Sequence, residues 1–114
     1  MNECLFCKIV RGEIPADKVY EDEHILVFRD IQPAAPVHLL AIPKDHITSV
    51  AQLGLENGDV VGYIFVQLAR VAAGLGLADG GYRIVTNCGK DGGQTVGHLH
   101  FHLLGGRQLA WPPG

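Results

Sequence analysis

Residues 97–104 read Gly-His-Leu-His-Phe-His-Leu-Leu, and this stretch decides the fold that we expect for the chain. Polar and apolar residues alternate along it, as they do in a β-strand, where successive side chains project from opposite faces. His98, His100 and His102 therefore share one face of a predicted strand. We expect the apolar face to pack on the core and the histidine face to point outward. Alternate Cα atoms on a strand lie about 6.5–7 Å apart, so hydrogen bonds through neighbouring groups can link the three rings.

The other patterns predict an α+β fold, with an antiparallel sheet of about five strands, one short helix and one long helix. Apolar residues at helical spacing predict a short helix near residues 4–12 and a long helix over about 55–74. Hairpin-like links between the strands indicate an antiparallel sheet. The length of 114 residues indicates a single domain, 1–114. The remaining strands are predicted from β-rich runs at residues 19–21, 25–28, 37–42 and 82–87.

The predicted long helix is apolar nearly all round, because Gln67 and Arg70 are its only strongly polar side chains between residues 60 and 75. Such a helix should be buried on nearly all sides, and one chain of this size does not provide that burial. We therefore expect a homodimer with this helix at the interface. Four residues would permit close approach there: Gly62, Val66, Ala69 and Ala73.

Composition excludes several classes of partner. The 9 basic and 12 acidic residues give a formal net charge of -3 without a basic cluster, so we expect no polymeric nucleic acid partner. Apolar runs are far shorter than the ~18 residues of a membrane span, so we expect no membrane partner. The N-terminus lacks a signal-peptide pattern, which predicts a cytoplasmic location. Three cysteines in such a chain predict no disulfide framework.

Three interpretations of the histidine face are open: a polar strand face that happens to contain histidines, a Zn²⁺ site, and nucleophilic catalysis by an imidazole nitrogen at phosphorus. The glycine-rich loop of residues 88–95 favours catalysis. Gly92 and Gly93 allow backbone N–H groups to approach an oxyanion, and Gln94 and Thr95 add side-chain donors. The combination indicates phosphoryl or nucleotidyl chemistry.

Residues 98–104 resemble the His-φ-His-φ-His-φ-φ signature, where φ is hydrophobic, of the histidine triad superfamily. Its members are nucleotide hydrolases and transferases that act at an α-phosphate. The C-terminal residues 104–108 and 111–114 resemble the branch of histidine triad nucleotide-binding proteins, which are homodimeric purine nucleoside phosphoramidases. The similarity also covers residues 6–9, 12–15, 28–31, 42–44, 81–83 and 91–94, with Pro33, Pro36 and His38.

The resemblance implies hydrolysis of adenosine 5′-phosphoramidates to AMP and an amine through a nucleotidyl-histidine, with no cofactor required for catalysis. Two alternatives stay open. One is a dinucleoside polyphosphate hydrolase of the same superfamily, and the other is a nucleotide-binding regulatory module with vestigial catalysis.

Roles of individual residues also follow from the resemblance. His100 corresponds to the nucleophile, His102 to a phosphate-contacting partner, and His38 to a histidine that orients it and relays protons. Thr95 stands where relatives often have a serine that is a candidate proton donor to the amine. Asp30 corresponds to the carboxylate that accepts the ribose hydroxyls. The implied nucleotide contacts are Phe28, Asp30, Ile31, Asn87, Gly93, Gln94, Thr95, His100 and His102.

Three interpretations of Cys4 and Cys7 are open: a redox pair, half of a zinc site, or two small helix residues. No βαβ pattern surrounds them, which disfavours a thioredoxin-like pair, and tetrahedral zinc needs two more ligands. Some members of the superfamily bind a structural zinc through this Cys-x-x-Cys and two histidines, whereas close relatives in the nucleotide-binding branch commonly lack it. The resemblance places the zinc ligands at Cys4, Cys7, His46 and His98. Cys88 has no argued role.

Overall fold

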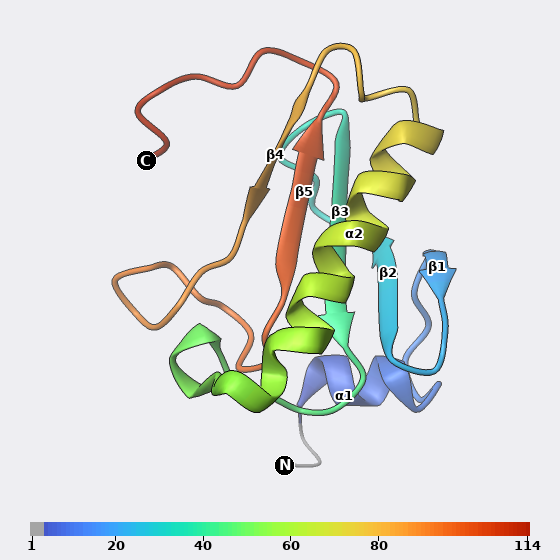
Figure 1. Ribbon diagram of the computed structural model, residues 1–114, viewed down its shortest axis with the longest axis vertical. Helices are drawn as coiled ribbons and strands as arrows, with labels where there is room; N and C mark the ends of the chain where they lie inside the picture. Colours follow the sequence, from blue (N-terminus) through green and yellow to red (C-terminus); the bar gives the residue numbers. More distant parts are fainter. Residues whose placement is uncertain (1–3) are drawn as a thin grey trace.

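A computed structural model describes residues 4–114 of the protein and shows one five-stranded antiparallel sheet with strand order β1-β2-β3-β5-β4 (Figure 1). The strands are β1 (Lys18–Glu21), β2 (Ile25–Arg29), β3 (Val37–Pro43), β4 (Tyr82–Val85) and β5 (Phe101–Gly105). The helices are α1 (Leu5–Val10) and α2 (Gly58–Gly74), and two 3₁₀ turns, η1 (Val50–Gln52) and η2 (Leu55–Asn57), precede α2. The predicted α+β fold with one short and one long helix is confirmed.

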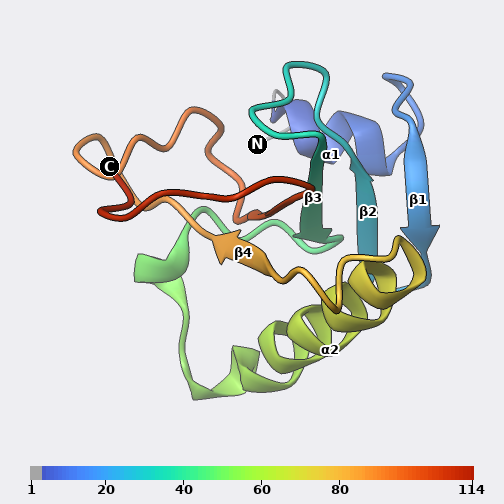
Figure 2. The same ribbon diagram turned by 90° about the horizontal axis from the view of Figure 1, so that it is seen from above.

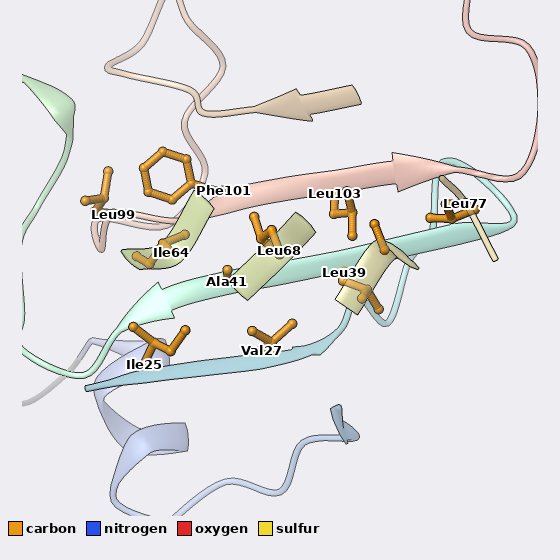
Figure 3. Close-up of a cluster of buried hydrophobic side chains, with 11 residues drawn as sticks. Ile25, Val27, Leu39, Ala41, Ile64, Leu68, Leu77, Leu99, Phe101 and Leu103 are labelled. Atoms are coloured by element: carbon orange, nitrogen blue, oxygen red, sulfur yellow. The ribbon is translucent and has the colours of Figure 1, made fainter. Parts of the chain in front are cut away.

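The helix α2 covers one face of the sheet and forms the main core. Its side chains Ile64, Leu68 and Ala72 are fully buried. Figure 3 shows Ile64 and Leu68 lying over the central strands. The burial of this apolar surface, at about 25 cal/mol per Å², is the main contribution to folding. The side chains that they meet are Ile25, Val27, Leu39, Ala41, Leu77, Leu99, Phe101 and Leu103.

The side of α2 that faces away from the sheet is exposed in the single chain. Phe65 is 43% exposed and Val66 is 50% exposed. Gly62, Ala69 and Ala73 lie on this exposed side as well. Burial on nearly all sides is therefore not achieved within one chain, and the homodimer stays a prediction. Within residues 4–114, neither α2 nor any other helix has the length and apolar character needed to cross a bilayer.

The short helix α1 covers the opposite face of the sheet (Figure 2). Phe6 and Ile9 are buried on it, and a six-residue helix depends on such packing because isolated short helices are marginal in water. Alternate residues of the central strands thus face two different cores. The strand residues on the α1 side are Leu26, Phe28, Leu40 and Ile42.

The outward-pointing histidine face predicted for residues 97–104 is wrong. β5 begins only at Phe101, so His98 and His100 lie in the irregular segment before it, where residues 96–98 form a bend. His98 is 0% exposed and His100 is 4% exposed. The Phe6 ring of α1 packs edge-on against both rings, with centroids 5.9 Å from His98 and 5.2 Å from His100. The apolar side of α1 is buried against the histidine face, and this packing covers His98 and His100.

Candidate active site and metal centre

A cleft of about 370 Å³ opens beside α1, and two of the three triad histidines lie on its wall. The end of β2 and the segment after it contribute Phe28, Asp30 and Ile31, and the segment before β5 contributes Thr95. The remaining lining residues are Leu5, Phe6, Ile9, Ile14, Pro15, Ala16, Arg29, Gln32, Leu40, Val96, His100 and His102. Most of the lining residues are apolar, and among the polar ones Asp30 lies close to His102, with ligand atoms within 4.8 Å of each other.

The backbone sets the tautomer of His100. Its Nδ1 lies 2.7 Å from the carbonyl oxygen of His98. A carbonyl oxygen accepts hydrogen bonds and does not donate them, so Nδ1 carries the ring proton. In the neutral ring, Nε2 therefore keeps its lone pair. His100 thus has a nitrogen that is available to attack an electrophile.

A second set of hydrogen bonds orders His38 and His102. The sheet register pairs Leu40 with His102, so His38, two residues earlier on β3, lies diagonally opposite on the same face. The Ala34 N–H donates to His38 Nδ1 at 2.9 Å, which places the ring proton of His38 on Nε2. This Nε2–H donates to His102 Nδ1 at 2.9 Å and lies 3.4 Å from an Asp30 carboxylate oxygen. The ring proton of His102 is therefore on Nε2.

Burial keeps this pair of imidazoles neutral. It lowers the pKa of His38, and the nearby Asp30 carboxylate only partly offsets that effect. Burial, together with the neighbouring His100 and His38 rings, lowers the pKa of His102 to about 4. Both rings are thus neutral at pH 7. The hydrogen bonds from Ala34 to His38 and from His38 to His102 require this, because each ring accepts at Nδ1.

Three predicted nucleotide contacts, Asn87, Gly93 and Gln94, do not line the cleft. The Asn87 amide donates to the Gly92 carbonyl at 2.7 Å, and the Gln94 amide oxygen accepts from the Gly89 N–H at 2.9 Å. Gly93 has a φ of 79°, which L side chains rarely adopt. These residues fix the shape of the loop before β5. Their contacts with phosphate stay a prediction.

The sequence reasoning missed the α1 side of the cleft. Leu5, Phe6 and Ile9 were predicted to form a helix, but nothing in their spacing placed that helix beside residues more than 80 positions away. The segment Ile14–Pro15–Ala16 completes this wall, and part of it lay within the stretch that resembles the superfamily. Contacts of this range follow from tertiary packing, which a local pattern does not show.

The four predicted zinc ligands come together at the N-terminal end of α1. Their ligand atoms all lie within 4.8 Å of one another. His98 Nδ1 lies 3.4 Å from Cys4 Sγ and 3.6 Å from Cys7 Sγ, and His46 Nδ1 lies 3.2 Å from Cys7 Sγ. Tetrahedral zinc, with bonds of about 2.3 Å to sulfur and 2.0–2.1 Å to nitrogen, separates sulfur from nitrogen by about 3.5 Å.

The hydrogen bond on the other ring nitrogen of His98 also suits a metal at this centre. The His98 Nε2–H donates to the Pro43 carbonyl at 2.8 Å, which leaves the Nδ1 lone pair directed at the two sulfurs. Such a bond on the far ring nitrogen is the usual partner of a metal-ligating histidine. The donor set and its spacing fit zinc.

A second cluster, Asp30, His38 and His102, also has ligand atoms within 4.8 Å of one another. Its two imidazole nitrogens are 2.9 Å apart, which is hydrogen-bond distance. Two nitrogens on tetrahedral zinc would lie about 3.3 Å apart. The zinc interpretation therefore fits the cysteine centre better than the histidines beside the cleft.

The sheet, the cleft and the paired histidines define a small domain that presents a buried imidazole with an open lone pair at the end of an apolar slot. A family model described as the HIT domain matches residues 11–109. The chain belongs to the histidine triad (HIT) family.

Relatives support this assignment over nearly the full length. The chain is 53% identical over 113 residues to an uncharacterized HIT-like protein of Synechococcus elongatus, which covers 99% of this chain and 98% of the relative. It is 50% identical over 112 residues to the 14 kDa zinc-binding protein of Zea mays, which covers 96% of this chain and 87% of the relative. The crystal structure of a HIT family hydrolase from Legionella pneumophila has a TM-score of 0.97 and 51% identity, with 98% of this chain and 100% of that chain covered.

Proposed function

We propose that this protein is a purine nucleoside phosphoramidase, which hydrolyses adenosine 5′-phosphoramidates to AMP and an amine. The hydrogen bond from His100 Nδ1 to the His98 carbonyl carries the proposal, because it leaves Nε2 as a nucleophile on the wall of the cleft. The similarity to a HIT family hydrolase supports hydrolytic chemistry. The preference for a P–N bond rests on the resemblance of the C-terminal residues to the nucleotide-binding branch.

The cleft accounts for nucleotide binding. A purine fits the apolar slot between α1 and the end of β2, where the Phe6 and Phe28 rings meet edge-on with centroids 5.5 Å apart. The Asp30 carboxylate lines the cleft, is 20% exposed, and accepts hydrogen bonds from the two ribose hydroxyls. This arrangement directs the α-phosphate toward His100 and His102.

In the first step, His100 Nε2 attacks the α-phosphorus and the P–N bond to the amine breaks. The His102 Nε2–H donates to a phosphate oxygen as negative charge develops there. The Thr95 hydroxyl donates its proton to the departing amine and takes one from a water molecule at the same time, so that hydroxide is released to solvent. In the second step, water attacks the nucleotidyl-His100, the N–P bond breaks, and AMP leaves. The proton that the attacking water loses neutralises the hydroxide released in the first step, and His100 regains its lone pair.

The first test compares turnover of a fluorogenic adenosine phosphoramidate with that of diadenosine polyphosphates, after treatment with EDTA. We expect the phosphoramidate to be hydrolysed and to be the better substrate by kcat/KM. A preference for the dinucleotides would favour the rival hydrolase. Binding of AMP without turnover of either substrate would favour the regulatory module. In protein that circular dichroism shows to stay folded without metal and that is saturated with substrate, activity that appears only after metal is restored would contradict catalysis by His100 alone.

Zinc in this proposal has a structural role. Cys4, Cys7, His46 and His98 would hold it and so tie α1 to the turn after β3 and to the segment before β5. When bound, zinc supplies rigid tetrahedral ligation of these side chains. The name of the zinc-binding relative from Zea mays supports this part of the proposal.

A homodimer is the proposed assembly, with the exposed side of α2 at its interface. Sedimentation velocity at micromolar concentration should show a species of twice the 12.3 kDa chain mass. Val66→Arg, which places a charge at the centre of the exposed side, should shift the protein toward monomer. Leu55→Arg is the control, because Leu55 is fully exposed and lies before α2. A wild-type species of about 12 kDa would contradict the proposed homodimer. Separately, a cytoplasmic location stays a prediction.

A further inference from the structure

We propose that the metal centre and the nucleotide cleft are thermodynamically coupled through α1, so that metal and nucleotide each increase the affinity of the protein for the other. This inference rests on the proposed function, and it makes Cys4 and Cys7 positioning residues for the cleft. A metal with a purely structural role would stabilise the fold and leave nucleotide affinity unchanged.

Residues of the two sites are interleaved on α1. Cys4 is the N-cap of the helix, and Cys7 follows one turn later. Between and just after them, Leu5, Phe6 and Ile9 line the cleft. One short helix therefore contributes two ligands to the metal centre and one wall to the nucleotide site. A displacement of the helix is therefore expected to alter both sites.

A metal at the N-terminal end of α1 would strengthen the attachment of this helix to the sheet. A helix of six residues has little stability of its own. Phe6 and Ile9 anchor it by burial, whereas the contacts of Cys4 and Cys7 with the two histidines involve sulfur at 3.2–3.6 Å. A thiol is a weak hydrogen-bond donor and acceptor. Metal ligation would replace these weak contacts with four bonds of fixed geometry.

Phe6 transmits the position of α1 to the reacting residues. It lies between the two cysteines in the sequence, and its ring packs edge-on against Phe28 and His100, with centroids 5.5 Å and 5.2 Å away. A shift of the helix therefore changes both the width of the apolar slot and the packing of the nucleophile. Holding α1 in place prepares the slot for the base before the nucleotide arrives, which lowers the cost of binding.

Linkage makes the coupling reciprocal, since the factor by which zinc changes AMP affinity must equal the factor by which AMP changes zinc affinity. The experiment measures both. Isothermal titration gives the AMP Kd of zinc-loaded protein and of protein stripped with EDTA and shown by circular dichroism to be folded. Competition with a chromogenic chelator gives the zinc Kd with and without saturating AMP. We expect both ratios to be about 10-fold and equal within error.

If the protein unfolds when zinc is removed, a substitution of one proposed zinc ligand provides a second test. His46 is exposed and lies outside both cores, so His46→Ala should fold and bind zinc more weakly. Its AMP affinity should fall at limiting zinc and recover at saturating zinc. His24→Ala, at an exposed histidine that is not a ligand, should behave as wild type.

Each failure has a separate signature. If zinc-loaded protein and folded stripped protein have equal AMP Kd values, the coupling is overturned and the proposed function stays intact. The same holds if the AMP affinity of His46→Ala does not change with zinc concentration. Protein that binds no zinc would overturn the coupling as well. Protein that binds zinc but no AMP in any form would overturn the proposed function and the inference with it.

Discussion

His100→Asn is expected to lower kcat/KM for an adenosine phosphoramidate by at least about 10⁴-fold while the protein stays folded. The substitution removes Nε2, the nitrogen that is proposed to attack phosphorus. The asparagine amide is close to the imidazole in size and can still donate to the His98 carbonyl, which accepts the His100 Nδ1–H at 2.7 Å in the wild type. Steady-state assays and thermal unfolding of both proteins provide the measurement.

A matched control distinguishes the loss of His100 in particular from the loss of any histidine. His24→Asn changes an exposed histidine in the turn between β1 and β2 and should keep wild-type turnover. Mass spectrometry of rapidly quenched wild-type reactions should find a nucleotidyl adduct on His100 and none on the variant. Turnover of His100→Asn above about 1% of the wild-type value would defeat the assignment of the nucleophile.

The pH dependence of stability should report the buried pair of His38 and His102. The folded-state pKa of His102 is about 4 and that of a free histidine is about 6.5. Between these values the unfolded chain binds more protons than the native protein, so stability is fully present above about pH 6.5 and falls as pH decreases toward 4. The shift corresponds to about 3 kcal/mol. Because His102 is partly exposed, we expect about half of that contribution.

Urea unfolding at pH 7, 6 and 5 measures this loss, and His102→Gln isolates it. The variant removes the titrating ring, so its stability should change less over this range than that of the wild type. Asp22 contributes at lower pH: burial raises its pKa, but hydrogen bonds from Tyr63, Tyr20 and two backbone amides outweigh burial and hold the pKa below its usual range. Parallel pH profiles for wild type and His102→Gln would contradict the assignment.

Alternation along residues 97–104 predicted correctly which histidines share a face, because side-chain alternation is a local property of an extended backbone. It did not predict that this face is buried. The cover is α1, which precedes His98 by almost 90 residues, and nothing in either segment alone specifies that they meet. The same long-range packing explains why the α1 wall of the cleft was missed.

The hydrogen-bond and ligand partners of a side chain could be predicted from the sequence for the cysteines and histidines, but not for the amides. The cysteine and histidine ligands come together as the resemblance implied, with their ligand atoms within 4.8 Å of one another. Asn87 and Gln94 are expected to contact phosphate, and this stays a prediction. The sequence did not predict that their amides also bond within their own loop and to the Thr48 carbonyl. An amide has several donors and acceptors that nearby backbone groups can satisfy, so its partners do not follow from its position in the sequence.

The hydrogen bond from the Ala34 N–H to His38 places an unexpected restriction on a surface loop. A backbone amide does not lose its proton in the ordinary pH range, so the direction of the chain through His38 to His102 is permanent. The side chain at position 34 has no part in this, and almost any residue would serve. Proline alone would remove the donor, although prolines stand at positions 33 and 36. The hydrogen-bonded pair of His38 and His102 thus constrains position 34 through its backbone N–H, and a comparison of side chains alone would not reveal this constraint.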